Sequence, residues 1–232
     1  MTAPHGRALL GGTFNPLHAG HMRLALEVLD SLPDQLEQVD FIPCANPPHK
    51  EGRFVLPFSL RAAMVEAACA PFPRLRVNGL EGSRTGYSYT WDTLLAYRRT
   101  LPVTPLYFLL GSEDFAQLDT WKHGLDLPQL ADMLVIPRKG ETAEVFTAVA
   151  HRFWPQARAG QPLRPQSLRL DIPAGGSLHF LPVPRLDISA TRIRQYWLEN
   201  KNIHFLVPET TRAQLEERRG EVWHCWQQGA TL

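Results

Sequence analysis

A segment rich in glycine and histidine constrains the fold of this chain more than any other feature. It reads GGTFNPLHAGH from Gly11 to His21 and follows an apolar run at Ala8 to Leu10. This order predicts a strand, a glycine loop with a proline turn, and then the start of a helix. Glycines let backbone approach phosphate closely, and the N–H groups and dipole of a helix start favour negative charge. The segment therefore predicts a site for a triphosphate.

The two histidines of this segment, His18 and His21, stand three residues apart. At that spacing both side chains fall on one face of a helix and can point at the same anion. This loop matches neither GxxxxGK[ST] nor GxGxxG, the motifs of the two commonest phosphate loops. The sequence therefore does not favour a P-loop NTPase or a dinucleotide-binding protein.

Strand-like and helix-like segments alternate along the rest of the chain. The expected strands are 7–10, 39–43, 75–77, 106–110, 133–137 and 178–182, and the expected helices are 21–32, 59–70, 90–99, 142–153 and 189–199. Alternation with nearly continuous apolar strands predicts an α/β fold with a doubly wound parallel sheet. Ligands bind such sheets beyond the carboxyl ends of the strands, which is where the glycine loop falls.

Length and composition predict one α/β domain over residues 1–200 and a helical extension over 201–232 that packs on the same domain. The 232 residues carry a net charge of +1, so bulk charge implies no basic face for nucleic acid. Three distant cysteines form no metal or disulfide pattern, and no apolar run approaches a membrane span, so we expect a cytoplasmic protein. The stretch Pro155 to Pro173 reads as a long surface connection, and 210–228 reads as helical.

Five blocks of the sequence resemble a known superfamily. His18-Ala19-Gly20-His21 and the stretch DISATRIR, from Asp187 to Arg194, resemble the HxGH and ISxTxxR motifs of the nucleotidylyltransferases, which have a Rossmann-like fold. Three further blocks resemble segments of the bacterial nicotinate-mononucleotide adenylyltransferases: 46–50 (NPPHK), 87–94 (YSYTWDTL) and 109–121 (LLGSEDFAQLDTW). Two positions depart from the family pattern, because Asn15 and Glu113 stand where members usually carry Asp.

The resemblance implies that the chain transfers the adenylyl group of ATP to nicotinate mononucleotide, giving nicotinate adenine dinucleotide and pyrophosphate. It implies catalytic roles for His18, His21 and Arg194. It implies ATP contacts from Gly11, Gly12, Thr13, Phe14, Gly111, Ile188 and Ser189, and mononucleotide contacts from His49, Lys50, Thr90, Glu113 and Trp121. Independently of the family, Ser189 is a good N-cap for the helix that follows it, and Arg194 then lies about one turn inside that helix.

The residues show no acidic cluster with metal-ligand spacing, so we expect no protein-held metal and Mg²⁺ to arrive on the phosphates of ATP. The expected partners are ATP and nicotinate mononucleotide, with no nucleic acid and no membrane, and a homo-oligomer stays open. Two alternatives also stay open. One is another adenylyltransferase of the superfamily, acting for example on nicotinamide mononucleotide. The other is a non-catalytic nucleotide-sensing domain. The presence of His18, His21 and Arg194 argues against it, because a sensor needs no groups that stabilise a transition state.

Overall fold

The computed structural model describes residues 5–48, 54–138 and 140–229. The strands are β1 (Gly6–Gly12), β2 (Leu36–Pro43), β3 (Leu75–Val77), β4 (Leu106–Gly111), β5 (Asp132–Ile136), β6 (Arg158–Ala159), β7 (Leu168–Asp171) and β8 (Ser177–Phe180). The α-helices are α1 (Ala19–Ser31), α2 (Phe58–Cys69), α3 (Thr90–Thr100), α4 (Ser112–Phe115), α5 (Ala143–Phe153), α6 (Ala190–Leu198), α7 (Glu209–Glu217) and α8 (Arg219–Gln227), and 3-10 turns cover Leu80–Ser83, Leu118–Thr120 and Gly124–Gln129.

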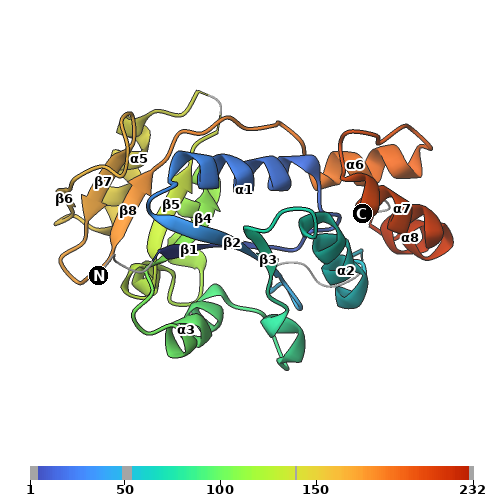
Figure 1. Ribbon diagram of the computed structural model, residues 1–232, viewed down its shortest axis with the longest axis horizontal. Helices are drawn as coiled ribbons and strands as arrows, with labels where there is room; N and C mark the ends of the chain where they lie inside the picture. Colours follow the sequence, from blue (N-terminus) through green and yellow to red (C-terminus); the bar gives the residue numbers. More distant parts are fainter. Residues whose placement is uncertain (1–4, 49–53, 139, 230–232) are drawn as a thin grey trace. The chain divides into compact units, whose positions relative to one another are not determined.

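The strands are arranged in the order β3-β2-β1-β4-β5-β8-β7-β6 (Figure 1). β1 pairs with β4, β4 with β5 and β5 with β8, all in parallel, with Leu10 opposite Leu109 and Val135 opposite Phe180. All but the last residue of β4 are buried, as expected of a parallel strand covered on both faces. Chain order reverses between β1 and β4, so the switch point of the sheet lies where the glycine segment leaves β1. The predicted doubly wound α/β fold is confirmed.

The chain divides into two compact units. The first contains the residues up to Gly11, Glu27–Val39 and Tyr89–Pro184. The second contains Gly12–Leu26, Asp40–Ser88 and the residues from Arg185 onward. The first unit therefore holds β4 to β8 with α3 and α5, and the second holds α2, β3 and the helices from α6 to α8.

The helices of the second unit share one apolar core, and α6, α7 and α8, orange to red in Figure 1, lie side by side. Its buried members are Leu56, Leu60, Met64, Ile193, Trp197, Ile203, Val207, Leu215, Val222 and Trp226. Helix α6 precedes residue 200 and α7 and α8 follow it, yet all three contribute to this core. The division into a domain over 1–200 and an extension over 201–232 stays a prediction.

One segment differs from what the sequence predicts. The stretch from Pro155 to Pro173, expected as a surface connection, contains β6 and β7, which pair antiparallel and extend the sheet beyond β8. These strands have two and four residues, too few for periodicity to reveal them. The stretch 210–228 is helical, as predicted, and is divided into two helices at Arg218, whose φ of −110° and ψ of 28° are not helical. No helix within the described residues has the length and apolar character needed to cross a bilayer.

A polar cluster joins the starts of β5 and β8 in the first unit. The Asp132 carboxylate accepts the Ser177 N–H at 2.8 Å, and the Ser177 hydroxyl lies 2.6 Å from Nε2 of the buried His179. Burial acts to raise the pKa of Asp132, but hydrogen bonds from His179 and Ser177 outweigh it and hold that pKa below its ordinary value. The carboxylate form is therefore the one that the fold stabilises.

We expect Asp132→Asn to lower the free energy of unfolding at pH 7 by about 1 kcal/mol, the difference between a charged and a neutral acceptor. Because the folded-state pKa of Asp132 is depressed, the wild-type advantage is present above the ordinary pKa and is lost as pH falls below about 4. Urea unfolding of the wild type and of Asp132→Asn, at pH 7 and below a pH of about 4, measures the difference in unfolding free energy. Asp34→Asn, at an exposed site, is the matched control. If the difference in unfolding free energy between the two proteins does not change with pH, the fold does not stabilise the carboxylate form of Asp132.

Candidate functional site

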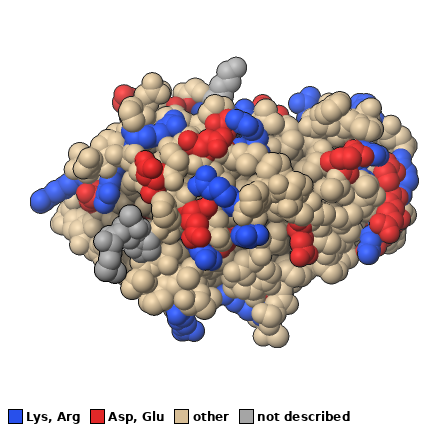
Figure 2. Space-filling view, viewed as in Figure 1, with Lys and Arg blue, Asp and Glu red and all other residues tan. Residues whose placement is uncertain are grey.

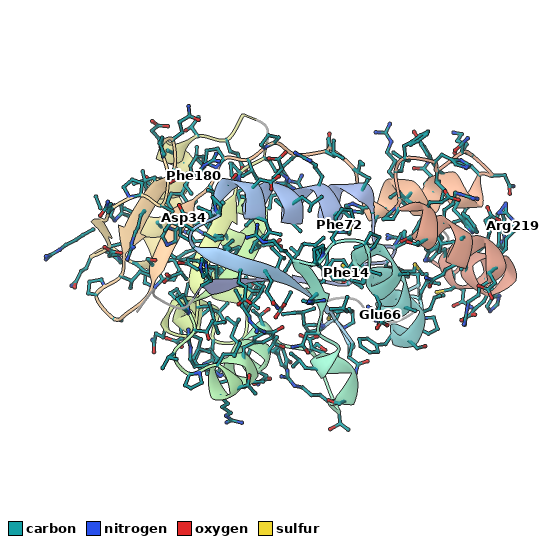
Figure 3. All side chains as sticks on the ribbon, in the orientation of Figure 1. Phe14, Asp34, Glu66, Phe72, Phe180 and Arg219 are labelled. Carbon is teal, nitrogen blue, oxygen red and sulfur yellow. The ribbon has the colours of Figure 1, made fainter. Side chains whose placement is uncertain are left out.

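The glycine loop after β1 is shaped by the ring of Phe14. That ring is 2% exposed and packs against Phe41, with ring centres 5.7 Å apart (Phe14 is labelled in Figure 3). A Cβ on Gly12 would lie 2.8 Å from the same ring, so this position needs glycine. Phe14 has a φ of 47°, which turns the chain sharply after Thr13. The side chain of Phe14 thus belongs to the core, and only its backbone can line the loop.

His18 and His21 form a stacked pair at the start of α1. Their ring centres are 3.6 Å apart, with an angle of 20° between the ring planes. The edge of Phe14 packs against the other side of the His21 ring at 5.0 Å. The His18 N–H lies 3.2 Å from Nδ1 of His21 and donates to it, so the ring proton of a neutral His21 resides on Nε2. The prediction that both histidines share one face is confirmed.

Burial controls the charge of His18. His18 is 7% exposed, and its Nδ1 has no hydrogen-bond partner within the described residues. Desolvation by burial lowers the pKa of His18 to about 4. At neutral pH His18 is therefore uncharged and can offer a neutral ring but no cation. A Cβ on Gly20 would lie 3.0 Å from the same Nδ1, which explains the glycine of the HxGH motif.

Arg61, which sequence analysis missed, lies beneath this loop. It is 1% exposed and comes from the first turn of α2. Its Nε donates to the Leu56 carbonyl at 2.8 Å, and its Nη1 donates to the carbonyls of Thr13 and Cys44 at 2.6 and 2.7 Å. Its Nη2 donates to the Ala45 carbonyl at 3.2 Å. One guanidinium thus binds the loop after β1 and the loop after β2 together.

The segment after β2 has further polar support within the second unit. The buried Glu81 accepts the Ala45 N–H at 3.3 Å. Asn46 donates its amide to the Gly86 carbonyl at 2.9 Å, and the Ser88 N–H donates to the Asn46 carbonyl at 2.9 Å. Two of the predicted blocks, the one at 46–50 and the one at 87–94, are therefore in contact through Asn46 and Ser88. His49 and Lys50 lie outside the described residues.

Helix α6 presents the second predicted motif. Ser189 is its N-cap, and the Ser189 hydroxyl accepts the Arg192 N–H at 3.2 Å, which confirms the predicted cap. Arg194 donates from Nη1 to the Asn15 carbonyl at 2.9 Å and from Nη2 to the Thr191 hydroxyl at 3.1 Å. Burial lowers the pKa of Arg194, so its guanidinium is partly desolvated but stays charged. The structure thus brings Arg194 to the loop that carries the two histidines, while Ile188 is half-buried just before the helix.

In the first unit, the end of β4 carries Gly111 and Glu113. Gly111 closes the strand, and Glu113 is exposed in the short helix α4. The Glu113 carboxylate pairs with the Arg138 guanidinium at 2.7 Å. Glu113 is therefore ion-paired with a residue that follows β5, and sequence analysis did not identify this contact.

The start of α3 and the segment around Trp121 lie against each other in the first unit. The Lys122 ammonium lies 3.0 Å from the Asp92 carboxylate and 4.7 Å from the centre of the Tyr89 ring. Trp121 is half-buried, with its ring edge-on to Phe108 at 6.5 Å. Tyr89 is the N-cap of α3 without a side-chain hydrogen bond, so the cap itself occupies none of the first N–H groups of the helix. The structure therefore brings the segments of Thr90 and Trp121 together.

Charges elsewhere do not suggest a different kind of site. Figure 2 shows Lys and Arg interspersed with Asp and Glu over the face in view. Within the described residues there is no group of three or more His, Cys, Asp or Glu side chains that could hold a metal ion. The clearest concentration of groups suited to an anion is the loop with His18 and His21 next to Arg194.

Known proteins are similar to this chain over most of its length. A family model described as cytidylyltransferase-like matches residues 9–196. A Geobacter metallireducens protein named "Probable nicotinate-nucleotide adenylyltransferase" is 37% identical over 216 residues, covering 91% of this chain and 95% of the relative. A Trichlorobacter lovleyi protein of the same name is 39% identical over 205 residues, covering 86% of this chain and 91% of the relative.

A solved structure with the same fold supports the observed architecture. Plasmodium falciparum nicotinic acid mononucleotide adenylyltransferase, solved in complex with NaAD, superposes with a TM-score of 0.69 at 15% sequence identity. The match covers 94% of this chain and 98% of the other. At this identity the comparison speaks for the fold alone.

Because the folded-state pKa of His18 lies near 4 and its ordinary value near 6.5, the unfolded chain binds more protons between these values. Stability should therefore fall as pH decreases from about 6.5 to about 4. We expect the unfolding free energy of the wild type to fall relative to that of His18→Gln by up to roughly 3 kcal/mol over this range. Chemical denaturation at several pH values measures it, and His151→Gln, at an exposed site, is the control. Parallel pH profiles for wild type and His18→Gln would refute the prediction.

Proposed function

Because the chain belongs to the cytidylyltransferase-like family and, within it, to the nicotinate-nucleotide adenylyltransferases, we propose that it transfers the adenylyl group of ATP to nicotinate mononucleotide. The products are nicotinate adenine dinucleotide and pyrophosphate. The phosphate of the mononucleotide attacks the α-phosphorus of ATP, and the bond from that phosphorus to the bridging oxygen of pyrophosphate breaks. A phosphate is already ionised at pH 7, so the reaction needs no general base.

The main support from the site itself is the contact between the histidine loop and Arg194. A reaction between two anions requires that they be held together and that charge on the transferring and leaving phosphates be stabilised. The Nε2–H of His21, the neutral ring of His18 and the Arg194 guanidinium are groups suited to that task. The backbone of Gly11, Gly12, Thr13 and Phe14 would line the α-phosphate, and Ile188 and Ser189 would add to the ATP site.

We further propose that Mg²⁺ is bound through the phosphates of ATP. Mg²⁺ prefers oxygen ligands and keeps several waters, and it needs only one or two protein carboxylates, or none. The ion would supply positive charge to the leaving pyrophosphate.

On the acceptor side, we propose that the start of α3 binds the carboxylate of the nicotinate. The first N–H groups of a helix favour an anion. Thr90 opens this helix, and the half-buried Trp121 offers a flat face for the pyridine ring. Glu113, His49 and Lys50 are proposed to contact the mononucleotide, with Glu113 held by Arg138.

A direct assay tests the function. The protein is incubated with ATP, Mg²⁺ and, separately, nicotinate mononucleotide, nicotinamide mononucleotide and phosphopantetheine, and pyrophosphate release is measured. Release with nicotinate mononucleotide, and much less or none with the other two acceptors, supports the proposal, whereas release mainly with nicotinamide mononucleotide would support the alternative adenylyltransferase. Release only with phosphopantetheine, or ATP binding without release, would point to another transferase or to a nucleotide sensor.

If His21 donates to the developing charge, we expect His21→Ala to lower kcat by roughly 10²–10³, the usual cost of losing one such donor. The fold should persist, because His21 is only half-buried. Steady-state kinetics together with thermal unfolding measure both effects, and His151→Ala, at an exposed site, is the control. Full activity of a folded His21→Ala protein would exclude the role.

The acceptor site should prefer the acid over the amide. An amide turns an NH₂ group toward N–H donors and leaves them unpaired, at about 1–3 kcal/mol per buried group. Two such donors predict a preference on the order of 10² or more in kcat/KM for nicotinate over nicotinamide mononucleotide.

A pair of variants tests the backbone origin of this preference. Thr90→Pro removes one N–H at the first helical position, which accepts proline, and Tyr89 before it has an extended backbone, as a residue before proline should. We expect Thr90→Pro to reduce the preference and Thr90→Ala, which keeps the N–H, to change it little. Equal kcat/KM values for the two mononucleotides in the wild type would contradict this account.

A further inference from the structure

Trp226, in the last helix, reaches the glycine loop. Its indole Nε1 donates to Oδ1 of Asn15 at 3.2 Å, and both side chains are buried, at 2% and 5% exposure. The two residues are 211 positions apart in the chain, so this contact couples α8 directly to the loop after β1.

Both the oxygen and the nitrogen of the Asn15 amide form hydrogen bonds. Its Oδ1 accepts the Leu56 N–H at 3.1 Å as well as the Trp226 indole, and its Nδ2 donates to the Phe54 carbonyl at 2.8 Å. An amide provides both the donor and the acceptors that this arrangement needs, whereas a carboxylate would turn an oxygen toward the Phe54 carbonyl. The structure therefore explains why this chain has Asn at position 15, where members of the family usually have Asp.

The backbone of Asn15 in turn holds Arg194. The Asn15 carbonyl accepts from Nη1 of Arg194 at 2.9 Å. Arg194, Phe54 and Trp226 all line one cavity of about 470 Å³ in the second unit, together with Thr191, Gln195 and Gly229. The Trp226 indole thus bonds the side chain of Asn15, and the Arg194 guanidinium bonds the backbone carbonyl of the same residue.

We infer that Trp226 is a positioning residue for ATP, which acts by fixing Asn15 and, through the Asn15 carbonyl, the guanidinium of Arg194. The inference rests on the proposed function, in which Arg194 binds the phosphates of ATP. It assigns the C-terminal helix a part in nucleotide binding, although none of its side chains is required to touch the nucleotide.

A neighbouring tryptophan provides a matched control. Trp197 belongs to the same core, is 3% exposed and packs edge-on to Trp226, with ring centres 6.1 Å apart. Its indole Nε1, however, has no hydrogen-bond partner within the described residues. Trp226→Phe and Trp197→Phe each delete one pyrrole ring from the same core, but only the first deletes a hydrogen bond to Asn15.

The experiment measures three quantities for the wild type and both variants: the Kd for ATP by calorimetry, the steady-state kinetic constants, and the melting temperature without ligand. Inorganic triphosphate is the second titrant, so that binding by Arg194 is followed without the rest of the nucleotide. We expect both variants to lose stability, and Trp226→Phe to lose more, because only that variant deletes a buried hydrogen bond. We expect only Trp226→Phe to weaken binding of ATP and triphosphate, by roughly five-fold for one hydrogen bond, with the KM for the mononucleotide unchanged.

Each outcome separates the two proposals. Equal binding losses in the two variants, or none in either, would overturn the positioning role of Trp226 while product formation by the wild type upholds the transferase. A wild type that binds ATP but forms no dinucleotide, with binding weakened only by Trp226→Phe, would overturn the proposed function and uphold the positioning role. A wild type that binds neither ATP nor triphosphate overturns both.

Discussion

The buried guanidinium of Arg61 is the interaction on which the loops of the second unit depend. A loop that offers its N–H groups to an anion must turn some of its carbonyls inward, where they need donors. Arg61 supplies donors to the carbonyls of Thr13, Cys44, Ala45 and Leu56 at once. A lysine has three donors and a different geometry, so it cannot replace this planar fork at four acceptors. The loop after β1 and the segment after β2 are thereby held as one body.

Local patterns predicted most of the fold and part of the site. The Ser189 cap and the two histidines follow from short-range spacing, and the structure has both. The central strands of the sheet follow from apolar runs, such as those of β4 and β5. The strands β6 and β7 do not, because they have only two and four residues.

Arg61 was missed for a different reason. An arginine inside a helix is usually solvated, so the residue type alone does not indicate a buried position. A signal was nevertheless present. Arg61 shares the spacing of Met64, Val65 and Ala68, which are buried residues of α2, and it therefore lies on the apolar face of that helix. A charged residue at such a position indicates either a buried ion pair or, as here, a guanidinium that binds backbone carbonyls.

The charges of the anion site are divided between two kinds of group. His18 is neutral above a pH of about 4 because it is buried, and its stacking on His21 at 3.6 Å would make two protonated rings repel strongly. The hydrogen bond from the His18 N–H to Nδ1 of His21 favours the neutral tautomer of His21 with the proton on Nε2. In the proposed site the histidines would therefore act as directional donors, and the permanent positive charge would come from Arg194. Because Arg194 does not titrate and burial keeps His18 neutral, the charges of these two groups stay constant from a pH of about 4 upward through neutral pH.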